Sequence, residues 1–108
     1  MKLELYQRKD EQIWCTITAD LSGGRLSISG HDLGPQVKEF FPDGEYEYSV
    51  SLTADNTRRL FESLGCADAP DERKLQVIKD TFENDRADSA LKEYCAERGI
   101  ETSFWCWP

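Results

Sequence analysis

Polar and apolar residues alternate along the first half of the chain, as they do in β-strands with one buried face. The alternation is most regular over residues 45–52, where every second residue is apolar or aromatic. Shorter segments with the same period lie around residues 3–5, 13–19 and 26–28. In the second of these, Trp14, Thr16 and Thr18 share the face opposite the apolar residues. The patterns predict four half-buried strands of the kind found in antiparallel sheets.

Turn-forming residues separate these segments. Gly23-Gly24 supplies the backbone freedom that a hairpin between the second and third strands requires. We interpret Gly30-His31-Asp32 as a further turn, followed by one helical turn within residues 37–41 and by Pro42-Asp43-Gly44. This connection is the longest in the first half, and long loops often carry function.

After residue 52 the spacing of apolar residues becomes helical. Thr53 or Asp55 can cap a helix that ends at Gly65, a second helix opens near residues 68–72, and a third follows residues 84–85. Residues 101–107 alternate again and predict a last strand. We therefore expect one α+β domain over residues 1–108, of order β-β-β-β-α-α-α-β. Its mainly antiparallel sheet has about five strands, with three helices packed on one face.

Composition narrows the classes of partner. The chain has 108 residues, with 21 acidic and 13 basic ones, and a formal net charge of −8. A basic face for nucleic acid is therefore not expected, and no apolar run has the length of a membrane span. The first residues lack the apolar core of a signal peptide, which predicts a cytoplasmic protein.

The cysteines predict neither a metal site nor a disulfide framework. Cys15, Cys66, Cys95 and Cys106 form no C-x-x-C pair, and there is a single histidine. No zinc or calcium spacing can be assembled from these residues, so we expect no metal and no cofactor. Cys15 and Cys106 alternate with aromatic residues in predicted strands, which indicates thiols in the core.

Acidic residues concentrate between positions 32 and 47. This stretch has five acidic residues and one basic residue, a local charge of −4 with its histidine neutral. A catalytic carboxylate pair is disfavoured because the polar face of a strand keeps acids ionised. Two interpretations stay open: a solvated surface, or a recognition surface that steers a basic partner. The acids are Asp32, Glu39, Asp43, Glu45 and Glu47.

The aromatic tail is a second candidate binding feature. Trp105 and Trp107 share one face of the last predicted strand, and Phe104 and Cys106 share the other. If helices cover only one side of the sheet, one of these pairs faces solvent, where tryptophans can anchor a protein partner. The alternative is a central strand with both faces covered.

His31 is the only histidine, so any Ser-His or Cys-His arrangement must include it. Asp32, next in the chain, could orient it. A small enzyme or ligand-binding domain that uses this pair is one alternative function, and a regulatory adaptor is another. The simpler interpretation of His31 is a histidine in a surface loop.

Three segments carry a resemblance to a known group of proteins. They are residues 26–35 (LSISGHDLGP), 40–49 (FFPDGEYEYS) and 99–105 (GIETSFW). The chain resembles short acidic bacterial proteins, and through its size and charge it is similar to immunity proteins of toxin systems, including contact-dependent growth inhibition. The resemblance implies a non-enzymatic protein that binds a cognate, basic toxin, such as a nuclease, and blocks its active or substrate-binding site. The five acids, with Trp105 and Trp107, would then contact the toxin.

Overall fold

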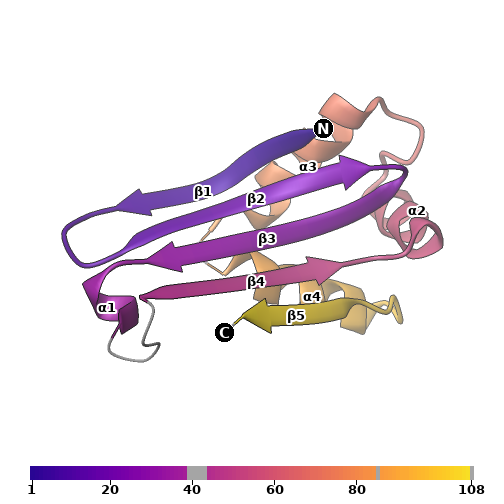
Figure 1. The fold of residues 1–108 in the computed structure, drawn as a ribbon. Coiled ribbons are helices and arrows are strands. Elements are labelled where there is room, and N and C mark those ends of the chain that lie inside the picture. Colours follow the sequence, from indigo (N-terminus) through magenta and orange to yellow (C-terminus); the bar gives the residue numbers. More distant parts are fainter. Residues whose placement is uncertain (39–43, 85, 108) are drawn as a thin grey trace.

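The computed structural model describes residues 1–38, 44–84 and 86–107. Its centre is a five-stranded antiparallel sheet whose strands lie side by side in chain order (Figure 1). The strands are β1 (Lys2–Lys9), β2 (Trp14–Ser22), β3 (Arg25–Leu33), β4 (Glu45–Ser51) and β5 (Ser103–Trp107). The predicted α+β class and the predicted order of strands and helices are confirmed.

Three helices form a layer behind the sheet (Figure 1). Helix α3 (Asp71–Phe82) packs against β1 and β2, α4 (Ala87–Glu97) against β3 and β4, and α2 (Ala54–Ser63) against β3. The short α1 (Pro35–Lys38) lies beyond the end of β3. In the part of the chain that the structure describes, no helix crosses the other face of the sheet. None of the described helices has the length and apolar character to traverse a membrane.

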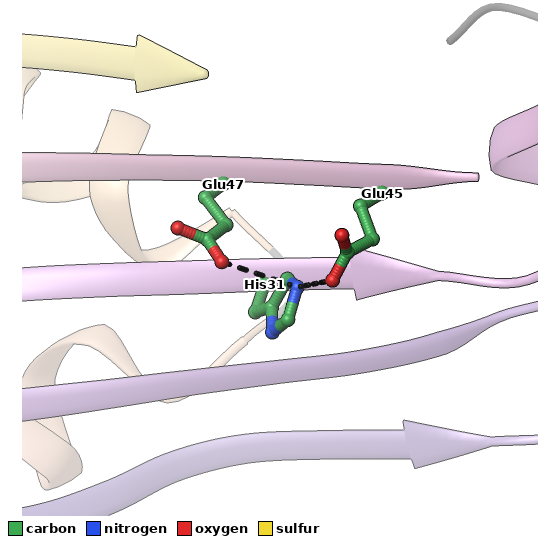
Figure 2. A group of neighbouring side chains, drawn as sticks. All are labelled: His31, Glu45 and Glu47. Atoms are coloured by element: carbon green, nitrogen blue, oxygen red, sulfur yellow. Dashed lines mark hydrogen bonds and ion pairs between the residues drawn. The ribbon is translucent and has the colours of Figure 1, made fainter. Parts of the chain in front are cut away.

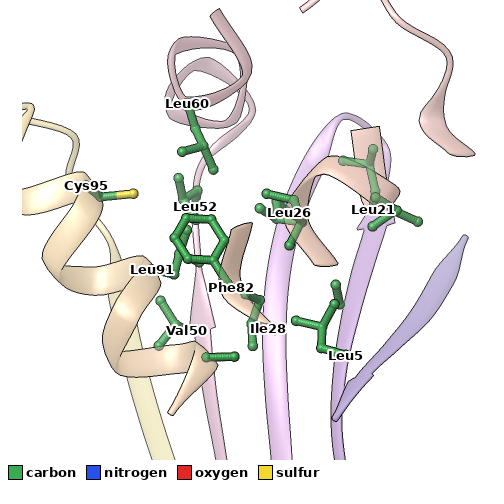
Figure 3. Close-up of a cluster of buried hydrophobic side chains, with 14 of the residues drawn as sticks. Leu5, Leu21, Leu26, Ile28, Val50, Leu52, Leu60, Phe82, Leu91 and Cys95 are labelled. Atoms are coloured by element: carbon green, nitrogen blue, oxygen red, sulfur yellow. The ribbon is translucent and has the colours of Figure 1, made fainter. Parts of the chain in front are cut away.

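The core lies between the sheet and this helical layer (Figure 3). The alternating residues of β2, β3 and β4 supply its floor, as the sequence predicts. The helices cover the core with their apolar residues, which recur at helical spacing and so lie on one side of each helix. Fully buried members include Ile17, Leu26, Ile28, Val50, Leu60, Phe61, Leu75, Ile78 and Leu91.

The prediction of a turn at Gly30-His31-Asp32 is wrong, because all three residues belong to β3. Glycine and aspartate are poor strand formers in isolation. Here β3 pairs with β2 on one side and with β4 on the other, and these two ladders hold the segment extended. The strand ends at Leu33 and the chain turns at Gly34, whose φ is +119°.

The tail forms the edge strand β5, so the alternative of a central, fully covered strand is wrong. Phe104 lies on the helical side, where the Lys92 ammonium sits 4.3 Å from its ring centroid, yet 48% of Phe104 is exposed. Cys106 is exposed too, which corrects the expectation of a core thiol. The helices do not fully cover the edge strand β5, so side chains on both of its faces are exposed to solvent. Cys15, in contrast, is buried as predicted.

Candidate functional site

The side of the sheet that points away from the helices is the candidate site, here called the uncovered face. Strand pairing arranges its side chains in rows that cross the sheet. One row contains Thr16, His31 and Glu47, and the next contains Thr18, Ser29 and Ser49. The rows line a shallow concavity of about 520 Å³ that is open to solvent. The site is thus an open depression on the face of the sheet.

Two tryptophans project from the uncovered face. Trp105 of β5 is 54% exposed and lines the concavity, and Trp14 of β2 is 41% exposed. The Lys9 ammonium sits 4.6 Å from the Trp14 ring centroid, a cation–π contact within this face. Trp107 pairs with Glu47 in the register, and the structure describes its backbone only. Large apolar side chains therefore remain in contact with water on a surface that is otherwise polar.

His31 brings two of the predicted acids together. The pairing of β3 with β4 places His31 directly opposite Glu47, and Glu45 lies two residues away on the same face. Nε2 of His31 lies 3.1 Å from Oε1 of Glu45 and 3.4 Å from Oε1 of Glu47 (Figure 2). Both carboxylates remain nearly half exposed. The result is a compact, charged cluster at the end of the uncovered face where Trp14 also lies.

Asp32 does not belong to this cluster. It follows His31 in a strand and so points to the helical side, where it lies opposite Tyr46. Its Oδ1 is buried and has no hydrogen-bond partner among the described residues. The pairing of His31 with Asp32 that an enzyme would use is therefore not formed. Of the remaining acids in the stretch, Glu39 and Asp43 lie outside the described residues.

Two tyrosine phenols, those of Tyr46 and Tyr48, lie on the helical side of β4. Burial raises the pKa of the Tyr48 phenol, and the carboxylates of Asp88 and Asp32 raise it further. Burial also raises the pKa of Tyr46. These phenols stay protonated at neutral pH and pack as part of the inner layer. The two phenols are therefore uncharged, and they lie on the same side of the sheet as the Asp32 carboxyl group.

Trp14 is not among the site residues expected from the sequence. Its alternation with Thr16 and Thr18 places it on the polar side of β2, and that signal is visible in the sequence. What the sequence does not show is that β2 and β5 expose their tryptophans on the same face, because this depends on strand order and register.

Comparison with protein-family models, with curated proteins and with solved structures finds no match for this chain.

Proposed function

We propose that this chain is a cytoplasmic immunity protein that binds a basic toxin domain through its uncovered face and blocks the toxin's active or substrate-binding site. The observation that carries the proposal is the exposure of Trp14 and Trp105 on the same face as Glu45 and Glu47. The resemblance to immunity proteins supplies the class of partner.

The dimensions of the face suit a protein partner. The sheet has five strands about 4.8 Å apart, and each strand is on average about 25 Å long. A flat sheet of these dimensions has an area of roughly 600 Å², and protruding side chains increase it. A typical stable interface buries about 800 Å² on each partner. A single globular domain could therefore cover most of the uncovered face.

The two tryptophans supply the apolar part of the contact. Trp is among the residues most often found at energetic centres of interfaces, because it removes a large apolar area from water at little conformational cost. Trp14 and Trp105 stand on β2 and β5, with β3 and β4 between them. A partner that covers both must also cover the cluster formed by His31 and the two glutamates.

The glutamates supply charge complementarity. Glu45 and Glu47 are exposed enough to attract a distant cation and close enough together to act as one negative centre. A nuclease-type toxin must present Lys and Arg where its phosphate substrate binds. A pair of glutamates that occupies those residues excludes the substrate without any chemistry of its own.

The test is protection from a toxin in cells. The chain is expressed together with each protein encoded beside its gene as a candidate toxin, and growth is measured with and without induction of that candidate. Wild type should restore growth, and Trp105→Ala combined with Glu47→Lys should abolish protection. A hot-spot tryptophan contributes about 2 kcal/mol or more to binding, which corresponds to roughly 30-fold in affinity.

A matched control changes charge on the helical layer. Glu83→Lys and Glu93→Lys alter exposed residues beside or within α3 and α4, away from the uncovered face. This variant should protect as well as wild type. The proposal is contradicted if the helical-layer variant loses protection while the Trp105 and Glu47 variant retains it. Binding of the partner without protection would favour the adaptor alternative.

A further inference from the structure

We propose that His31, Glu45 and Glu47 form a binding site for a divalent transition-metal ion of the zinc class. The sequence shows no metal-binding spacing, because these residues lie 14 and 16 positions apart in the chain. The pairing of β3 with β4 is what brings them together. The inference does not depend on the proposed function, since the three residues hold their positions without any partner.

The geometry suits an ion without movement of the backbone. Zinc binds a histidine nitrogen and a carboxylate oxygen at about 2.0–2.2 Å, so two ligands of a tetrahedral ion stand about 3.4 Å apart. Nε2 of His31 lies 3.1 Å from the Glu45 oxygen and 3.4 Å from the Glu47 oxygen. One ligand atom from each of the three residues lies within 4.8 Å of the other two. Small side-chain rotations would therefore complete a three-ligand site (Figure 2).

The charges of the cluster can accommodate a divalent ion. Nε2 of His31 can carry a single hydrogen, whereas two carboxylates converge on it. A protonated imidazole leaves the cluster with a charge of −1, because it offsets only one of the two glutamates. A divalent ion bound to neutral imidazole brings the charge of the cluster to zero, so the negative centre of the proposed docking surface belongs to the state without a bound ion. The lone pair of Nε2 then serves as a ligand.

The donor set selects the class of ion. Imidazole nitrogen with two carboxylate oxygens suits zinc, nickel and copper, whereas calcium and magnesium prefer sites made of oxygen alone. The three side chains are between 39% and 49% exposed, so water can fill the remaining coordination position. A site of this kind is expected to exchange its ion with solvent.

The test measures zinc binding to the full chain by isothermal titration calorimetry. In parallel, NMR follows the imidazole protons, which report on one residue because His31 is the only histidine. Wild type should bind one zinc ion and shift these resonances. His31→Ala and Glu47→Gln should each weaken binding by about tenfold or more. Far-UV circular dichroism establishes that both variants are folded.

Two control variants separate this site from other sources of zinc affinity. Glu4→Gln removes one charge from β1, two strands away from His31, and should bind zinc as wild type does. Cys106→Ser removes the exposed thiol and should also bind normally. The proposal is overturned if Cys106→Ser abolishes binding, if His31→Ala leaves binding unchanged, or if zinc leaves the imidazole resonances in place.

Discussion

The ring of Tyr48 lies directly against the backbone of Gly30, its cross-strand neighbour between β4 and β3. A β-carbon built at Gly30 would overlap the ring, so this position accepts no side chain while Tyr48 holds its place. An aromatic residue that covers a glycine on the paired strand restores the packing that the glycine lacks. Gly30 belongs to segment 26–35 and Tyr48 to segment 40–49, two of the segments that carry the resemblance. The contact explains why a glycine and a tyrosine occur together at these positions.

Gly30→Ala should therefore destabilise the protein, although its backbone φ is accessible to alanine. Replacing glycine by alanine at a compatible φ stabilises a protein by about 0.4–1 kcal/mol. Overpacking a filled site costs about 1–3 kcal/mol and outweighs that gain. Urea unfolding should show a net loss. In a Tyr48→Val background the same substitution should cost little or should stabilise, and equal losses in both backgrounds would refute the steric explanation.

The side-chain hydroxyl of Thr57 links α2 to β3 by a hydrogen bond. Oγ1 of Thr57, a buried residue, accepts the N–H of Leu26 at 3.0 Å. Thr57→Val keeps the shape but leaves this N–H without its acceptor, which should lower the free energy of unfolding by about 1–3 kcal/mol. Thr57→Ser, which keeps the acceptor, should lose less. The same Thr→Val change at exposed Thr81 should stay within about 0.5 kcal/mol of wild type. Equal losses at the two sites would contradict the assignment.

The thiols should differ in reactivity. Cys106 is exposed on the edge strand, whereas Cys15 and Cys95 are buried. Burial raises the pKa of the Cys95 thiol, and of Cys66 as well, which lowers the fraction of reactive thiolate. Iodoacetamide should modify native protein first at Cys106, then at Cys66, and at the two buried thiols only in urea. Peptide mass spectrometry determines the order in which the cysteines are modified. Modification of Cys95 before Cys106 would contradict the prediction.

Asp10 gives the turn between β1 and β2 a pH dependence. Its carboxylate accepts the backbone N–H groups of Gln12 and Ile13 and pairs with Arg8, and these contacts lower the pKa of Asp10. The native state therefore releases this proton more readily than the unfolded state. The stabilisation is complete above about pH 5 and is lost as the pH falls through the native pKa. Asp10→Asn should lose less stability than wild type between about pH 5 and pH 2. Identical pH profiles in urea unfolding would contradict this.

Much of the fold can be predicted from the sequence, because each element carries its own periodicity. The alternation of β4 and the stripe of Leu75, Ile78 and Phe82 in α3 are local patterns, and the structure follows both. The extension of β3 through Gly30-His31-Asp32 cannot be found in this way. It depends on hydrogen bonds from two neighbouring strands that are distant in sequence.

The candidate site is harder to predict, because it depends on which face each residue occupies. A shift of one residue moves a side chain to the opposite side of a sheet. Asp32 and His31 therefore separate, although they are adjacent in the chain, whereas His31 and Glu47 meet across two strands. Strand order also makes β5 an edge, which exposes Trp105. Neither relationship follows from spacing alone.

The most direct test of the central claim is the salt dependence of association with a basic toxin domain against which the chain protects, measured by stopped flow. Glu45→Gln with Glu47→Gln removes two charges from the uncovered face, and Glu83→Gln with Glu93→Gln removes two from the helical layer. We predict that the first pair slows association by roughly tenfold at low salt and flattens its salt dependence, because steering depends on charges near the contact. The second pair should resemble wild type. Equal effects of the two pairs, or association that salt does not change, would contradict a docking role for the uncovered face.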